Sequence, residues 1–277
     1  MRAILFGVLL MSCVATGLPP TLLVSTQDQQ HTVYLQRTTS PVMEEWKPSP
    51  GTSWQIQFTG VLDTSQEVQM YDLDLFDTSI QTIEELHSQG RRVVCYFSAG
   101  SWEDWRPDAD TFPEEVLGND LEGWPGEKWL DVRRLDVISP IMSNRLELAS
   151  NKGCDGVDPD NVDGYRNETG FPLTAEDQLS YNIWIADQAH LRGLAVGLKN
   201  DLSQIQKLLP YYDWVINEQC IQYNECNLLL PFIQAGKPVF GIEYQGDPDV
   251  FCPLVNALNF NFLKKNMELD EWRIACR

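Results

Sequence analysis

Short apolar segments that read as β-strands alternate with helical segments along most of the chain, and this alternation limits the possible folds more than any other feature. Strands separated by helices pair in parallel, and eight such units predict a (β/α)8 TIM barrel, an α/β fold, in a single domain. The residues expected to form the eight strands are 54–58, 68–75, 92–97, 129–132, 154–158, 194–198, 214–216 and 238–242.

Helical spacing of apolar residues predicts the intervening helices. One begins after Thr174, whose side chain forms a capping box with Asp177, and it ends at Gly193. The 102–128 segment is rich in Trp and Pro and is expected to be a long irregular loop. The other helices are expected at residues 79–89, 138–151, 202–209, 228–235 and 252–265. A doubly wound open sheet is the alternative, but the chain has no glycine-rich phosphate loop.

The N-terminus has the pattern of a secretory signal peptide over residues 1–19. Arg2 precedes a short apolar run, and small residues follow at 15–17. Residues 20–50 are polar and contain Pro41, Pro48 and Pro50, which predicts a flexible lead-in to a hydrolase domain at 51–277. No segment reaches the length of about 18 apolar residues that a membrane span needs. The sequence therefore predicts a secreted, extracellular protein without a membrane partner.

The cysteines agree with an oxidising compartment. Cys13 lies in the signal segment, which leaves six cysteines and room for three disulfides. Cys220 with Cys226 is the simplest local pair, and Cys95–Cys154 with Cys252–Cys276 would complete one of fifteen possible pairings. A glycosylation sequon begins at Asn167.

The chain is strongly acidic, with 40 Asp and Glu residues against 20 Lys and Arg residues and a formal net charge of -20. This charge repels nucleic acid and attracts cationic ligands. The simpler interpretation is a solvated surface that keeps the protein soluble. We expect a monomer without a nucleic-acid partner.

Polar residues follow nearly every predicted strand, at the edge where barrel enzymes carry their active sites. The 155–163 stretch is the densest, with four aspartates in nine residues. Residues 158–164 resemble a calcium loop, but Val162 occupies a ligand position and Gly164 comes one place late. The three histidines share no strand end, and no G-x-S-x-G motif is present. The sequence therefore predicts no metal and no cofactor.

Paired carboxylates that cleave a glycosidic bond fit this edge better, because one carboxyl group donates a proton while the other acts as nucleophile or base. Asp155–Asp160 resembles part of the signature of family 18 chitinases, but Val162 stands where that family has its acid. A chitinase of that type is therefore excluded.

A stronger resemblance is to glycoside hydrolase family 114, the secreted endo-α-1,4-polygalactosaminidases. Its motifs occur in order over most of residues 50–246. They are Tyr71–Asp74, Cys95–Ser101, Gly123–Glu127, Trp129–Asp131, Cys154–Tyr165, Gly197–Asn200 and Asn217–Cys220. The resemblance implies a (β/α)8 barrel that cleaves α-1,4-linked galactosamine polymers, which are cationic where they are not acetylated. A cationic or partly acetylated polysaccharide is therefore the expected partner.

The resemblance places the catalytic carboxylates at Asp160 and Glu218. It leaves open which is the acid, and whether the reaction retains or inverts the anomeric configuration. The residues expected to contact the substrate are Asp74, Tyr96, Asp158, Asp163, Tyr165, Lys199, Asn200, Glu243 and Tyr244. A barrel that binds polysaccharide without cleaving it is the alternative function.

Overall fold

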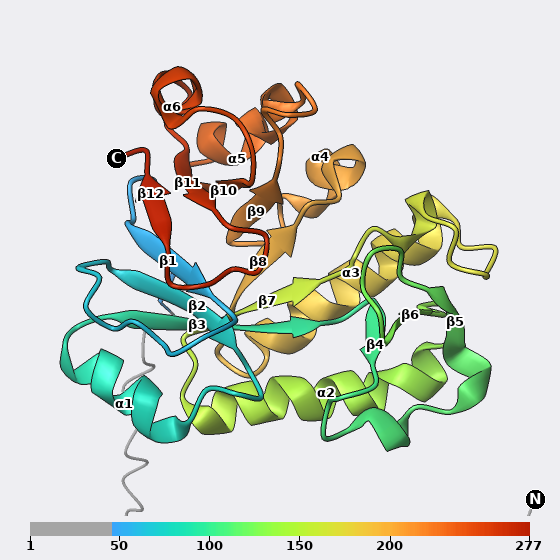
Figure 1. Ribbon diagram of the computed structural model, residues 1–277. Coiled ribbons are helices and arrows are strands. Elements are labelled where there is room, and N and C mark those ends of the chain that lie inside the picture. Colours follow the sequence, from blue (N-terminus) through green and yellow to red (C-terminus); the bar gives the residue numbers. More distant parts are fainter. Residues whose placement is uncertain (1–45) are drawn as a thin grey trace, which may run out of the picture. The chain divides into compact units, whose positions relative to one another are not determined.

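The computed structural model describes residues 46–277, in which parallel strands form the wall of a barrel (Figure 1). The sheet follows the order β1-β2-β3-β7-β8-β9-β10-β11-β12, and every neighbouring pair is parallel except the last. The eight parallel strands are β1 (Trp54–Gln57), β2 (Met70–Asp74), β3 (Arg92–Ser98), β7 (Gly156–Asp160), β8 (Ala195–Lys199), β9 (Trp214–Glu218), β10 (Val239–Glu243) and β11 (Asn261–Lys265). The predicted (β/α)8 TIM barrel is confirmed.

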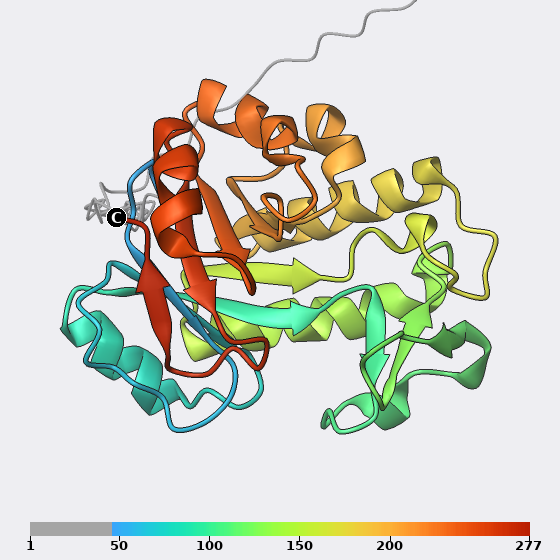
Figure 2. The ribbon, with the colours of Figure 1, turned by 45° about the horizontal axis from the view of Figure 1, so that its top comes forward.

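Helices lie on the outer side of this wall (Figure 2). They are α1 (Ile80–Ser88), α2 (Leu135–Lys152), α3 (Ala175–His190), α4 (Ile205–Leu208), α5 (Leu230–Gln234) and α6 (Pro248–Ala257). The Thr174–Asp177 capping box forms as the sequence predicts and fixes the start of α3. Gly153 ends α2 in the left-handed conformation, which a glycine adopts without steric cost.

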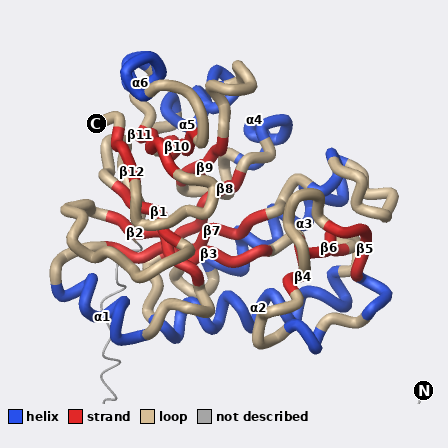
Figure 3. The backbone as a smooth tube through the Cα atoms, viewed as in Figure 1, coloured by secondary structure: helices blue, strands red, loops and turns tan. Residues whose placement is uncertain are grey.

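Two predicted elements are wrong, and the errors offset each other in the strand count. The 129–132 segment belongs to β6 (Glu127–Leu130), which pairs with β4 (Ser101–Glu103) and β5 (Leu117–Asp120) in a separate three-stranded sheet (Figure 3). The segment expected to be a loop therefore contains ordered strands. The predicted 252–265 helix ends early, and Asn259, at φ 62°, turns the chain into β11, the eighth barrel strand.

The barrel has a seam between its first and last parallel strands, where no backbone ladder joins β1 to β11. The short strand β12 (Arg273–Ala275) pairs with β11 in antiparallel fashion beside this seam. The Trp54 indole donates across it to the carbonyl of Asn261 at 3.0 Å, and the Phe58 amide donates to the carbonyl of Leu269 at 2.8 Å. The C-terminal segment therefore closes the barrel.

Side chains inside the barrel form an apolar layer with a charged layer above it. The apolar layer includes Trp54, Ile56, Met70, Val94, Trp214, Phe240 and Leu263. Gly197 is required there, because an added Cβ would lie 2.2 Å from the Trp214 indole nitrogen. Nearer the carboxyl ends of the strands, the fully buried interior instead contains Asp72, Asp158 and Lys199. The apolar layer thus forms the floor beneath a polar site.

The three expected disulfides are present. Cys95–Cys154 links β3 to the start of β7, Cys220–Cys226 closes the loop after β9, and Cys252–Cys276 links α6 to the end of β12. The predicted signal peptide and most of the predicted lead-in lie outside the described residues. Of the lead-in's last residues, Trp46 packs on Trp214 with ring centroids 6.4 Å apart. None of the helices described is long and apolar enough to cross a bilayer.

Candidate active site

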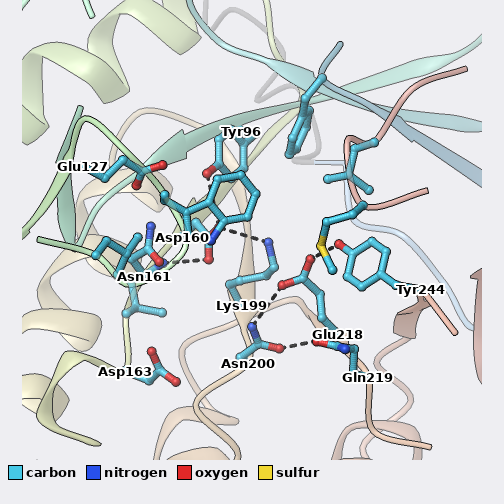
Figure 4. Close-up of a pocket in the computed structure, with 16 residues that line it drawn as sticks. Tyr96, Glu127, Asp160, Asn161, Asp163, Lys199, Asn200, Glu218, Gln219 and Tyr244 are labelled. Carbon is cyan, nitrogen blue, oxygen red and sulfur yellow. Dashed lines mark hydrogen bonds and ion pairs between the residues drawn. The ribbon is translucent and has the colours of Figure 1, made fainter. Parts of the chain in front are cut away.

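A cavity of about 320 Å³ opens at the carboxyl ends of the barrel strands (Figure 4). Its polar lining consists of Tyr96, Glu127, Asp160, Asn161, Asp163, Lys199, Asn200, Glu218, Gln219 and Tyr244. Apolar side chains complete the wall, namely Phe58, Leu121, Trp124, Val162, Met267 and Leu269. The lining comes from barrel strands, from the insert that contains β4, β5 and β6 (residues 101–130), and from the segment between β11 and β12.

Asp160, at the end of β7, is held by donors on several sides. The Tyr96 hydroxyl donates to Oδ2 at 3.2 Å, and the backbone amide of Asn161 donates to Oδ1 at 2.7 Å. The Lys199 ammonium lies 3.3 Å from Oδ2. These contacts hold the Asp160 carboxyl group in a fixed orientation.

Glu218, at the end of β9, faces Asp160 from the other side of Lys199 (Figure 4). The Tyr244 hydroxyl donates to Glu218 Oε1, and the Asn200 amide donates to Oε2 at 3.5 Å. Asn200 Oδ1 in turn accepts from the backbone amide of Glu218 at 3.0 Å. Glu218 is thus fixed by neutral donors, whereas Asp160 is fixed by a lysine.

The chain turns sharply after each of the three central strands. Asn161, Asn200 and Gln219 follow β7, β8 and β9 and have φ values of 60°, 51° and 68°. Residues other than glycine rarely adopt this left-handed backbone conformation, and those that do occur preferentially at functional sites. The turn after β7 also needs Gly100 beside it, because an added Cβ would lie 1.7 Å from the carbonyl oxygen of Asn161.

Beneath the cavity, Lys199 also contacts the buried Asp158. Its ammonium lies 3.7 Å from Asp158 Oδ2. Burial alone would lower the pKa of Lys199, but the attraction of Asp160, Glu218 and Asp158 raises it well above its ordinary value. Burial raises the pKa of Asp158 to about 7, although Lys199 opposes this change. The Lys199 ammonium therefore stays charged whatever the state of Asp158.

Asp72 lies in the same buried layer as Asp158. Burial, followed by repulsion from Asp158, raises the pKa of Asp72 well above its ordinary value. Neither carboxyl oxygen of Asp72 has a conventional hydrogen-bond partner among the described residues. Both effects favour the neutral acid form of Asp72 in the folded protein.

The cavity has two further carboxyl groups. Burial raises the pKa of Glu127 to about 7, and burial with repulsion from Asp160 raises the pKa of Asp163 to about 6. With Asp160 and Glu218 they make four carboxyl groups around Lys199, the one cationic side chain among the described residues that line the cavity. The cavity has a surplus of acidic groups.

The structure brings seven of the expected site residues to the cavity and leaves four outside its lining. Those at the cavity are Tyr96, Asp160, Asp163, Lys199, Asn200, Glu218 and Tyr244. Asp158 is 0% exposed and lies one layer below, so its burial does not fit the expected substrate contact. Glu243 is also buried and accepts from the Ile221 amide at 2.7 Å.

The other two residues outside the lining have partners of their own. Asp74 lies 2.7 Å from Arg106 in a buried ion pair and also accepts from the amides of Phe76 and Asp77. The Tyr165 hydroxyl donates to Asp201 at 3.1 Å. For Asp74, Asp158, Tyr165 and Glu243, the contacts indicate support of the site rather than contact with a ligand.

Sequence reasoning gave no role to several side chains that reach the cavity. Glu127 and Trp124 lie in the Gly123–Glu127 motif, and this family motif could have indicated that they reach the site. Met267 and Leu269 precede β12, and nothing in the sequence marked them. Within residues 46–277, no group of three or more His, Cys, Asp or Glu side chains is arranged to hold a metal ion.

The sequence profile of glycoside hydrolase family GH114 matches residues 36–277. The chain belongs to this family. The resemblance seen in the sequence is thereby confirmed, and with it the expectation of a glycoside hydrolase of the polygalactosaminidase type.

Solved structures agree with the family assignment. Ega3 of Aspergillus fumigatus, crystallised in complex with galactosamine, is 45% identical, covers 84% of this chain and 98% of its own, and superposes with a TM-score of 0.80. The glycoside hydrolase domain of PelA from Pseudomonas aeruginosa has 14% identity, with a TM-score of 0.68 over 80% of this chain and 98% of that domain. At that identity the similarity shows the fold alone. A comparison with curated proteins found no significant match.

Proposed function

We propose that this family 114 hydrolase is a secreted, endo-acting enzyme that cleaves α-1,4-linked galactosamine polymers, with Asp160 and Glu218 as its catalytic carboxylates. The main support is their arrangement on two sides of Lys199 at the cavity (Figure 4). Glycoside hydrolysis needs two carboxyl groups, one on each side of the scissile bond. The three disulfides support secretion, because such bonds persist in oxidising compartments.

The contacts of the two carboxylates suggest how they divide the work. Asp160 accepts from Tyr96 and the Asn161 amide and pairs with Lys199, so it suits the role of nucleophile or base. Glu218 contacts neutral donors, Tyr244 and Asn200, and suits the role of the acid that protonates the glycosidic oxygen. Departure of the protonated oxygen leaves positive charge at the anomeric carbon, which the Asp160 carboxylate faces.

The charge of the cavity and of the chain supports a cationic polymer as substrate. The cavity has four carboxyl groups against one lysine, and the chain has a net charge of -20. Free amino groups on galactosamine units would be attracted to such a surface. Galactosamine is also the ligand in the Ega3 structure. Trp124, 50% exposed at the cavity, offers an aromatic face for a sugar ring.

Reducing-end release from de-N-acetylated galactosamine polymer tests this proposal. We expect the wild-type protein to release reducing ends, and Asp160→Asn and Glu218→Gln each to lower kcat by at least about 100-fold. Asp187→Asn, an exposed substitution on α3, is the matched control and should retain full activity. Circular dichroism of each variant verifies that it is folded.

Two results would overturn the proposal. Near wild-type turnover by a folded Asp160→Asn or Glu218→Gln variant would remove that residue from catalysis. Binding of the polymer by the wild-type protein without any release of reducing ends would favour the non-catalytic barrel instead.

A further inference from the structure

Glu127 enters the cavity from the insert rather than from the barrel. It begins β6, after the turn that contains Trp124, and lies across the cavity from Lys199 (Figure 4). Gly126, at φ 94°, shapes this turn, and an added Cβ there would lie 2.9 Å from Asp104 and 3.0 Å from Trp105. The position of the Glu127 carboxylate is therefore set by the fold of the insert.

One oxygen of Glu127 is anchored and the other is not. The Ser101 hydroxyl donates to Oε2 at 2.7 Å, and the Asn161 amide donates to that same Ser101 oxygen at 3.1 Å. Oε1 has no hydrogen-bond donor among residues 46–277, although the side chain lines the cavity and Glu127 is only 7% exposed. Oε1 keeps solvent-accessible surface, so a ligand in the cavity can contact it.

Glu127 also differs from Asp160 and Glu218, whose oxygens all have partners, because its Oε1 has none among the described residues. The Asp163 side chain, also at the cavity, likewise has no hydrogen bond or ion pair among those residues. Asp160 pairs with Lys199, and Glu218 accepts from Tyr244 and Asn200. Within the part of the chain that the structure describes, no Lys, Arg or His lies within ion-pair distance of Glu127. A nearly buried carboxylate without a cation in the protein is suited to a cation that arrives with the ligand.

We propose that Glu127, oriented by Ser101, is a specificity-determining residue that binds the ammonium group of an unacetylated hexosamine unit in the cavity. This inference rests on the proposed function, since it assigns the amine of the same substrate to a third carboxylate. An ammonium group supplies the donor and the charge that Oε1 lacks, whereas an acetamido group supplies no charge and is larger. Asp160 and Glu218 then remain free for bond cleavage.

The acidity of Glu127 gives this recognition a pH dependence. Burial raises its pKa to about 7; repulsion from Glu103 and Asp160 adds to this change, and the Ser101 hydrogen bond and Arg106 oppose it. The free cavity therefore holds the protonated acid at pH 5 and increasingly the carboxylate above pH 7. Only the carboxylate pairs with an ammonium group. Preference for free-amine units over acetylated units should therefore rise with pH through this window.

The experiment measures kcat/KM on two polymers, one fully de-N-acetylated and one N-acetylated, from pH 5 to pH 7. The ratio of the two values cancels the protonation steps that both reactions share. For the wild-type protein we expect this ratio to rise about tenfold over the range, as the fraction of ionised Glu127 increases. Glu127→Gln should lower kcat/KM on the free-amine polymer by about 10- to 100-fold, change it less than 3-fold on the acetylated polymer, and leave the ratio independent of pH.

Three further variants identify the group responsible. Glu127→Asp, which keeps the charge, should restore part of the preference. Glu122→Gln removes an exposed charge from the same insert and should behave as wild type. Asp163→Asn tests the cavity carboxyl group whose side chain has neither an ion pair nor a hydrogen bond among the described residues, and its ratio should still rise with pH.

The outcomes separate this inference from the proposed function. A wild-type protein that releases no reducing ends from either polymer refutes the proposed function, and this inference with it. A wild-type protein that cleaves the free-amine polymer, together with a Glu127→Gln variant of unchanged ratio and pH profile, refutes the role of Glu127 alone. A loss of preference in Asp163→Asn but not in Glu127→Gln would assign the ammonium group to Asp163 instead.

Discussion

Replacement of Lys199 by Met removes the one positive charge among the described residues that line the cavity. The lysine is 2% exposed, and its ammonium lies 3.3 Å from Asp160 and 3.7 Å from Asp158. At an effective dielectric constant of about 20, each contact is worth roughly 5 kcal/mol before desolvation is subtracted. Loss of one partner from a buried ion pair costs about 3–5 kcal/mol, so we expect the unfolding temperature to fall by roughly 6–20 °C.

The pH dependence of this loss follows from Asp158. Its folded-state pKa of about 7 is above its unfolded value of 3.8, so the wild-type protein loses stability as pH rises toward 7 and then levels off. Without Lys199 the carboxyl group has lost its attracting charge, and its pKa rises further. The variant therefore continues to lose stability above pH 7, by at most about 1.4 kcal/mol per pH unit relative to the wild-type protein.

Thermal unfolding at pH 6 and pH 9 measures this difference. The gap between the wild-type protein and Lys199→Met should be wider at pH 9. In the Asp158→Asn background the same lysine substitution should give a gap that does not change with pH. Lys237→Met is the control, because that ammonium donates to the carbonyls of Leu209 and Tyr212 rather than to a carboxylate. An equal gap at both pH values, or one that Asp158→Asn leaves unchanged, would refute the reasoning.

Three other substitutions give distinct expected results. Tyr244→Phe removes a hydrogen bond to the proposed acid worth about 1.5–3 kcal/mol, so kcat/KM should fall about 10- to 100-fold, whereas Tyr165→Phe, outside the cavity lining, should change it less than 3-fold. Asp72→Asn mimics the neutral acid; because a raised folded-state pKa costs the wild-type protein stability as pH rises above the unfolded value of 3.8, calorimetry should find that the stability advantage of the variant is larger at pH 8 than at pH 4. Replacement of Cys252 and Cys276 by Ser opens a 24-residue loop and should cost about 3.5 kcal/mol, and a loss below about 1 kcal/mol would contradict this view of the link.

The sequence predicted the fold because the period of its apolar residues and its helix caps are local signals. The last barrel strand was missed, because Asn259, not a glycine, adopts the left-handed conformation that ends the helix. Without a glycine as a stop signal, Phe262 and Leu263 were assigned to the same helix. The 129–132 segment has the composition of a barrel strand, but its neighbours in space come from the insert. Pairing partners of this kind are set by tertiary contacts, which a local pattern does not contain.

The sequence predicted which strand ends form the site. It did not predict how deep each side chain lies in the barrel or toward which face it points. Successive residues of a strand point to opposite faces, so Tyr244 enters the cavity while Glu243 beside it is held by a backbone amide. Asp158 and Asp160 point to the same face of β7, but Asp158 lies two residues earlier in the strand and is therefore in the buried layer below the cavity. Depth along a barrel depends on the stagger of its strands, and no spacing within one strand reveals it.

The segment between β11 and β12 both closes the seam between β1 and β11 and lines the cavity. The segment that leads into β12 receives the hydrogen bonds of Phe58 and Thr59 at Leu269, and Leu269 with Met267 also lines the cavity. Local opening of this segment would widen the entrance for a polymer and loosen the barrel in the same motion. Substrate access and unfolding should therefore share an early step, and bound polymer should slow hydrogen exchange at β12 although β12 itself is not part of the cavity lining.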